Sequence, residues 1–258
     1  MKAYADGKIQ VQQQGPVTTV IINRPEVRNA LDNDAARGLG RAMRDFDADD
    51  SQAVAVLSGA GGAFCAGADL KQVAGSSDYV AWAGDPDGPT NPTLSKPVIA
   101  AVEGHAVAGG LGIALWCDIR IVDETTVFGV FCRRWGVPMS DGTTVRLPRL
   151  IGAARALDML ITGRGVNADE AIDWGLATRR AAKGQTRQVA EELALQIAGF
   201  PQIAMRSDRM SAYKQAGQTM EDAVRTEKEL SQEAKAIEAS EGAARFATGA
   251  GRHGEFSE

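Results

Sequence analysis

Two glycine-rich turns constrain the fold of this chain more than any other feature. The first, SGAGGAFCAGADLK at residues 58–71, follows the short apolar run 53–57, and the second, EGHAVAGGLGIAL at 103–115, follows the apolar run 97–102. Each turn leads into a helical pattern. Strands that alternate with helices through such turns indicate a layered sheet, so the sequence predicts an α/β fold.

The other segments of the first half fit this interpretation. Residues 8–13 and 17–22 are rich in β-formers and flank a Gly-Pro turn, which predicts a hairpin. Apolar residues recur every three or four positions in 32–46, and Asp32 can cap the resulting helix. Residues 119–122 predict one more strand. The Gly-, Pro-, Asp- and Ser-rich stretch 75–92 lacks periodicity and predicts a mobile loop over a site.

Beyond Val145 the patterns are helical, and the sequence predicts no further strand. The predicted helices span residues 145–161, 167–174, 187–198, 201–215 and 221–246, several of them with Glu and Lys on the exposed face. The second half of the chain is therefore expected to end in an all-helical region.

Composition narrows the class of partner. The 258 residues carry a formal net charge of −5, which argues against a nucleic-acid surface and favours small-molecule chemistry. No apolar run approaches the roughly 18 residues that cross a bilayer, so we expect no membrane segment and a cytoplasmic location. The three cysteines lie far apart in apolar surroundings and are expected to be reduced and buried. No cluster has the spacing of metal ligands, so no metal is expected.

The two turns offer a way to bind a negatively charged oxygen. The first backbone N–H groups of a helix have no acceptor within the helix and lie at its positive end. One such group from each turn, aimed at the same carbonyl oxygen, would form an oxyanion hole. Alternatively, the glycines serve only tight turns and close helix packing. Neither turn matches a GxGxxG, GxxxxGK[ST] or GxSxG motif.

Several segments in this order resemble the crotonase, or enoyl-CoA hydratase/isomerase, superfamily, and the resemblance covers nearly the whole chain. The segments are NRPEVRNAL (23–31), FCAGADLK (64–71), AGGLGIALWCDIRI (108–121), FGVFCRRWGVP (128–138), GTTVRLPRLIG (142–152) and ITGRGVNADEAIDWGLA (161–177).

This resemblance implies a fold, a substrate class and an assembly. It implies a spiral core of ββα units at residues 1–195 and a C-terminal helical region at 196–258 that builds homotrimers or hexamers. The implied substrates are acyl-CoA thioesters, with coenzyme A as part of the substrate and no separate cofactor. By motif, the oxyanion donors would be the amides of Ala68 and Gly109. The residues assigned to the coenzyme A moiety are Arg28, Ala66, Asp69, Leu70 and Lys71.

The same resemblance identifies a departure from the family. Hydratases of this family use two glutamates, and their positions fall here on Gly112 and Cys132. Neither residue can hold and deprotonate a water molecule, because general acid–base catalysis needs a titratable group at the reacting proton. We therefore expect isomerisation or another enolate reaction rather than hydration.

Asp141 is the candidate for the missing base. It lies in the segment where several isomerases of the family carry theirs, but one position later. Burial near an acyl chain would raise its pKa and help it carry a proton between C2 and C4. Alternatively, Asp141 or Ser140 is only the N-cap of the following helix.

Other polar residues near the motifs have weaker functional interpretations. His105 and Cys132 could act in catalysis, or could be a hydrogen-bonded scaffold residue and an inert packed thiol. Arg133 and Arg134 could meet a coenzyme A phosphate or a neighbouring subunit, or could be solvated. Glu103 and Glu124 do not occupy catalytic positions, Asp69 could stabilise its own turn, and Asp118 is expected to be structural. Two alternatives to isomerisation therefore stay open: hydration by unusual groups, and a non-catalytic acyl-CoA binder.

Overall fold

The computed structural model describes residues 2–75, 82, 87–90 and 93–249. The chain divides into two compact units, residues 1–197 and 198–258. Much of the loop predicted at 75–92 lies outside the described residues. Within the described part of the chain, no helix combines the length and the apolar character needed to span a membrane.

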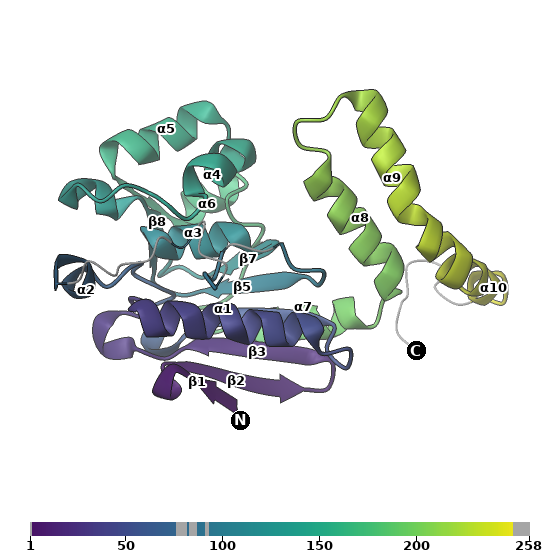
Figure 1. Ribbon diagram of the computed structural model, residues 1–258, viewed down its shortest axis with the longest axis horizontal. Coiled ribbons are helices and arrows are strands. Elements are labelled where there is room, and N and C mark those ends of the chain that lie inside the picture. Colours follow the sequence, from purple (N-terminus) through teal and green to yellow (C-terminus); the bar gives the residue numbers. More distant parts are fainter. Residues whose placement is uncertain (1, 76–81, 83–86, 91–92, 250–258) are drawn as a thin grey trace. The chain divides into compact units, whose positions relative to one another are not determined.

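A seven-stranded sheet forms the centre of the first unit (Figure 1). Strands β1 to β3 are antiparallel, and β3, β4, β5, β7 and β10 follow one another in parallel. The predicted hairpin and the three predicted strands are confirmed. In sheet order, the strands are β1 (Lys2–Tyr4), β2 (Ile9–Gln14), β3 (Val17–Ile22), β4 (Val54–Gly59), β5 (Val98–Val102), β7 (Ile119–Val122) and β10 (Arg179–Arg180).

Helices cover both faces of the sheet at β3. Helix α1 (Asn33–Ala48) begins as predicted, because the Asp32 side chain accepts a hydrogen bond from the Ala35 amide at 2.8 Å. Its apolar face packs on the antiparallel strands. From α7 (Thr186–Ala198), Glu191 accepts a hydrogen bond from the Thr19 hydroxyl at 2.8 Å. Every residue of β3 is therefore buried.

A second, three-stranded sheet contains β6 (His105–Val107), β8 (Val127–Gly129) and β9 (Gly165–Asn167). The prediction that strands stop beyond Val145 is wrong, because β9 and β10 both follow that residue. Strands of two or three residues are too short to show an alternating pattern, so only their pairing identifies them.

The predicted helix at 145–161 is two helices, α4 (Thr143–Ile151) and α5 (Ala153–Thr162). Gly152 separates them with a φ of 81°, which a helix cannot include. Helix α6 (Ala168–Asp173) follows. The second unit is helical, as expected, with α8 (Gln202–Lys214), α9 (Met220–Ala234), a π-helical turn (Lys235–Ala239) and α10 (Ser240–Ala247). The predicted helix at 221–246 is thus interrupted by the π turn.

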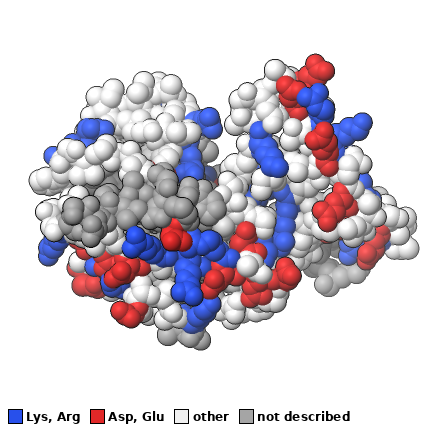
Figure 2. Space-filling model, viewed as in Figure 1, with Lys and Arg blue, Asp and Glu red and all other residues white. Residues whose placement is uncertain are grey.

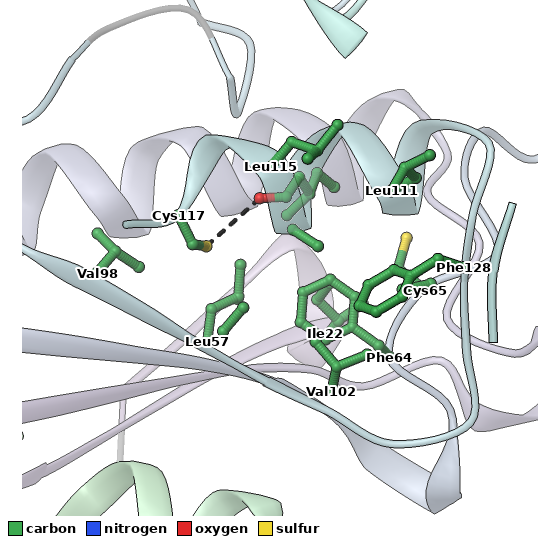
Figure 3. Packing of buried hydrophobic residues seen from close by; sticks show 14 of the residues in the cluster. Ile22, Leu57, Phe64, Cys65, Val98, Val102, Leu111, Leu115, Cys117 and Phe128 are labelled. Atoms are coloured by element: carbon green, nitrogen blue, oxygen red, sulfur yellow. Dashed lines mark hydrogen bonds between the residues drawn. The ribbon is translucent and has the colours of Figure 1, made fainter. Parts of the chain in front are cut away.

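Helix α3 (Gly109–Trp116) runs through the core of the first unit. Residues 110–115 are all buried, which explains why the helix has no polar face. Figure 3 shows Leu111 and Leu115 of α3 close to buried side chains from the strands. Cys65 and Cys117 lie in the same core (Figure 3), and all three cysteines are free and buried, as predicted.

Charged side chains lie on the surface shown in Figure 2. There, Lys and Arg side chains lie beside Asp and Glu side chains, in keeping with the mixed charge of the chain and its net value of −5.

Candidate active site

The two glycine-rich turns lie side by side because they follow neighbouring parallel strands. β4 pairs with β5, so the ends of both strands meet at one edge of the sheet. Beyond that edge, the Cys65 amide donates a hydrogen bond to the His105 carbonyl at 2.9 Å, and the Val107 amide donates to the Cys65 carbonyl at 3.0 Å. These two hydrogen bonds tie the turns together.

Ala68 and Gly109 line the same cavity. Gly67 lies against the second turn, since a Cβ atom at Gly67 would be 2.8 Å from the Gly109 nitrogen. Leu31 bonds to Gly67 and Asp69, so the Ala68 amide between them points away from Leu31. The Gly109 amide begins α3 and has no acceptor within the helix. In the described part of the chain, neither amide donates a hydrogen bond, and both residues line one cavity.

Ala108 sets the direction in which α3 starts. It has a φ of 51° and a ψ of −126°, a conformation that residues with a side chain rarely adopt. Its amide donates to the Gly129 carbonyl of β8 at 2.8 Å, which holds the turn in place. Such backbone strain costs on the order of 1–3 kcal/mol and persists only where the surrounding structure enforces it.

Asn29 organises the first turn and was missed in the sequence. It is 0% exposed, and its amide nitrogen donates to the carbonyls of Ala60 at 2.8 Å and Ala63 at 2.6 Å. Its side-chain oxygen accepts a hydrogen bond from the Arg24 amide at 2.8 Å. The only signal for this role was the position of Asn29 within the NRPEVRNAL motif.

A cavity of about 120 Å³ lies where the two turns meet. Its walls are mostly apolar, and Asp141 is the only acidic side chain among the described residues that line it. The lining residues are Ala66, Ala68, Leu70, Trp82, Ala108, Gly109, Phe131, Cys132, Trp135, Val137, Pro138, Met139, Ser140 and Asp141.

The Asp141 carboxylate lies directly against the backbone of Gly112. A Cβ atom at Gly112 would be only 2.1 Å from Oδ2 of Asp141, so the carboxylate fills the space that a side chain at position 112 would need. The other oxygen, Oδ1, accepts a hydrogen bond from the Thr143 amide at 2.9 Å. Asp141 therefore supports the start of α4, whose N-cap is Gly142, and also faces the cavity.

Burial raises the pKa of both titratable groups on this wall. Asp141 is only 3% exposed, and this burial raises the pKa of its carboxyl group, with partial compensation by the hydrogen bond from the Thr143 amide. Burial also raises the pKa of the Cys132 thiol, and the nearby Asp141 charge raises it further. Cys132 Sγ lies 3.1 Å from Met139 Sδ. These surroundings favour a packed, protonated thiol over a nucleophile.

Comparison with known proteins identifies the family. The family model described as enoyl-CoA hydratase/isomerase matches residues 12–250. The chain belongs to the enoyl-CoA hydratase/isomerase family. A probable enoyl-CoA hydratase of Rhizobium meliloti (strain 1021) is 36% identical over 249 residues, covering 95% of this chain and 96% of the relative. A carnitinyl-CoA dehydratase of Proteus mirabilis (strain HI4320) is 36% identical over 201 residues, 76% of this chain and 77% of the relative.

Solved structures agree with this family membership. The crystal structure of an enoyl-CoA hydratase from Mycobacterium tuberculosis H37Rv has a TM-score of 0.88 and 32% identity, covering 93% of this chain and 96% of that chain. The structure of enoyl-CoA hydratase EchA1 from Mycobacterium marinum also has a TM-score of 0.88, at 30% identity, with 93% and 96% coverage. The predicted crotonase-like α/β fold is confirmed, and the protein is an acyl-CoA enzyme of the enoyl-CoA hydratase/isomerase family.

Of the five residues assigned to coenzyme A in this enoyl-CoA hydratase/isomerase family member, two line the cavity and three do not. Ala66 and Leu70 line the cavity, Leu70 in α2 (Leu70–Gly75). Arg28 and Lys71 are exposed and lie outside the cavity lining. Asp69 forms an ion pair with Arg24 at 3.2 Å, which supports its own turn.

The remaining polar candidates have structural partners. Asp118 accepts a hydrogen bond from the Val98 amide at 2.7 Å, which confirms its structural role. His105 lies outside the cavity lining, and its pKa is lowered by burial and by the charge of Arg28. The other contacts are Thr186 to Glu103 at 3.0 Å, Lys183 to Glu124 at 3.3 Å, Arg133 to the Leu160 carbonyl at 3.2 Å and Arg134 to the Gly163 carbonyl at 2.8 Å.

Arg133 and Arg134 are therefore not simply solvated. Although both are exposed, each donates to a carbonyl at the C-terminal end of α5, where the helix leaves its last acceptors unpaired.

Proposed function

We propose that this protein moves a proton next to the thioester carbonyl of an acyl-CoA, and that its net reaction is isomerisation of an enoyl-CoA double bond. Asp141 acts as the base. The amides of Ala68 and Gly109 bind the oxygen of the enolate. The observation that carries this proposal is the buried carboxylate of Asp141, the single acid among the described residues of a cavity wall that Ala68 and Gly109 also line.

The proposed reaction uses one group twice. The Asp141 carboxylate removes a proton from C2 of a 3-enoyl thioester, and the C–H electron pair moves toward the thioester oxygen to form a dienolate. The carboxylic acid then returns the proton to C4, which places the double bond between C2 and C3. Atoms and charge balance without another reactant. Burial raises the pKa of Asp141, which makes its carboxylate a stronger base toward the proton at C2.

Hydration is the second candidate, because several relatives carry the name enoyl-CoA hydratase. It would require a group that holds and deprotonates water. Gly112 has no side chain and Cys132 is a thiol with a raised pKa, so Asp141 would have to do this alone.

Mass spectrometry in deuterated water separates these reactions. We expect a mixture of acyl-CoA esters to gain deuterium at C2, without addition of water, for the members that are substrates. Asp141→Asn should lose this exchange while retaining affinity for the thioesters. Glu124→Gln is the matched control, because Glu124 is a surface acid of the same unit outside the cavity, and it should retain exchange.

Three outcomes would contradict the proposal. Unchanged exchange in Asp141→Asn would remove this residue from the mechanism. Addition of water would favour hydration. Binding by the parent protein without exchange in any thioester would identify a non-catalytic acyl-CoA binder.

We also infer that the protein assembles as a homotrimer or as a dimer of trimers, as its family resemblance implies. Large exposed apolar side chains on the helical second unit support this inference, because such surfaces commonly lie in subunit contacts. They are Phe200, Tyr213, Met220, Val224, Ile237 and Phe246. Light scattering after gel filtration should give the mass of three or six chains, and a monomer mass would contradict the inference.

A further inference from the structure

Trp82 forms one wall of the cavity beside the second oxyanion donor. Its side chain is nearly buried, at 4% exposure, and lies against Gly109. A Cβ atom at Gly109 would be 2.2 Å from Cζ3 of the indole and 2.7 Å from Cη2. The six-membered ring of Trp82 therefore lies against the backbone that bears the donor.

Other aromatic side chains line the same cavity at different depths. Phe131 and Trp135 belong to the 3₁₀ helix Phe131–Trp135. Trp135 is 72% exposed and Leu70 is 41% exposed, so they lie at the mouth, whereas the Trp82 side chain is buried. Aromatic walls favour planar ligands, because flat groups make extensive contact with them.

The size of the cavity limits what can lie between these walls. The volume is about 120 Å³. For comparison, an apolar cavity of about 150 Å³ binds one benzene molecule. An acyl group of roughly four to six carbons fits a space of that order, and a fully enclosed long chain does not.

We propose that Trp82 is the specificity-determining residue of this enzyme, and that the indole ring restricts its substrates to short-chain enoyl-CoA thioesters, whose alkene carbons are planar. The ring blocks extension of the acyl chain past Gly109. It also keeps water away from the donor amide, which strengthens a hydrogen bond to the thioester oxygen. This inference rests on the proposed function for its catalytic consequence, but its effect on binding is independent of turnover.

The test compares acyl chain lengths in Trp82 variants. In the parent protein, deuterium exchange at C2 should be fastest for thioesters with acyl chains of four to six carbons. It should be at least about ten-fold slower for a chain of ten carbons, because each methylene group that does not fit a pocket lowers the rate by about ten-fold or more. Trp82→Ala should raise the ratio of long-chain to short-chain rates by about ten-fold or more, and Trp82→Phe should give an intermediate ratio.

Trp135→Ala is the matched control. It removes the same type of side chain from the exposed mouth of the same cavity, so all chain lengths should change alike. Thermal melting establishes that each variant is folded, and Trp82→Phe preserves the test if Trp82→Ala does not fold.

Calorimetric titration with unreactive S-alkyl coenzyme A thioethers of increasing length separates the two proposals. Suppose that the parent exchanges no thioester but binds short thioethers best, and that Trp82→Ala or Trp82→Phe removes this preference for short chains. The proposed reaction is then contradicted, and the role of Trp82 in specificity is supported. If folded Trp82 variants keep the parent's length preference, or if the parent prefers ten carbons or more, the specificity role is overturned.

Discussion

One side of the cavity is lined by Ala68 and Gly109, whose amides are the proposed donors, and is called the donor side here. The other is lined by Asp141, the proposed base, and is called the acid side. On the donor side, adjacent parallel strands deliver both turns to one edge of the sheet, and hydrogen bonds through Cys65 tie them together. On the acid side, one carboxylate depends on a hydrogen bond to Thr143 and on the absence of a side chain at position 112.

This difference shows which parts of the site tolerate change. A donor made of backbone is fixed by the fold, and any side chain that permits the same turn keeps it. An acid made of one side chain depends on that side chain's own contacts, which here are with Thr143 and with the backbone of Gly112. The carboxylate can therefore change position during evolution while the donors stay, and a different reaction can follow on the same fold.

The largest expected effect comes from removing one donor. Replacement of Ala68 by lactic acid exchanges the amide for an ester and keeps the methyl group. Turnover should fall by about 10²–10³-fold, since this is the typical cost of one lost oxyanion donor. Steady-state rates with a short enoyl-CoA measure the effect, and thermal melting establishes that the fold is retained. An unchanged rate would show that the thioester oxygen binds elsewhere.

Gly112→Ala should displace the Asp141 carboxylate on the acid side and lower the rate. The added Cβ overlaps Oδ2 of Asp141, while Oδ1 is held by the Thr143 amide, so the carboxylate must move. A displacement of about 1 Å at a reacting group costs about 10²-fold in rate. If Gly112 acts through Asp141, Gly112→Ala should cause no further loss of rate in a protein that already carries Asp141→Asn. Additive losses in the double variant would contradict this coupling.

Asp141→Asn should make the protein more stable at neutral pH. Burial raises the folded-state pKa of Asp141 above its ordinary value of 3.8. The stability that the protonated group contributes is thus fully present below the ordinary value and is lost as the pH rises through the folded-state pKa. Asparagine cannot ionise and avoids that loss. Urea unfolding from pH 3 to pH 8 should show a stability difference that grows with pH, and a constant difference would contradict this account.

The smallest effect is expected at the donor side, from Ala108→Gly. Glycine adopts a φ of 51° without strain, which should stabilise the fold by about 1 kcal/mol after the greater entropy of an unfolded glycine is subtracted. Turnover should change little, because the Gly129 carbonyl still holds the turn. Urea unfolding measures the gain. Ala114→Gly, in the interior of α3, is the control and should destabilise the protein.

Much of the first unit could be predicted because its signals are local. The hairpin, the start of α1 at Asp32 and the two glycine turns all depend on neighbours within a few residues. The short strands β9 and β10 could not, since their pairing partners lie far away in the chain. The prediction of a single helix at 145–161 was wrong for a local reason, because Gly152 adopts a conformation that the apolar pattern does not reveal.

The sequence predicted the proposed donor residues of the candidate site, but only some of its other residues. Motif positions identified Ala68, Gly109 and Asp141, all of which line one cavity. Trp82 gave no signal, because it lies in a stretch without periodicity. Asn29 lies within a quoted motif, yet its role depends on carbonyl groups about thirty residues later in the chain.

By itself, the sequence determined the α/β class, the position of both turns and the family resemblance, because repeated local patterns encode them. Only the tertiary structure showed that the N-cap of α4 is Gly142, and not Asp141 or Ser140 as the alternative expected. The Asp141 carboxylate accepts a hydrogen bond from the Thr143 amide and also lines the cavity. The reason is physical: the spacing along a chain cannot show that a carboxylate before α4 packs against the backbone of Gly112 in α3. That contact exists only after the helices have packed.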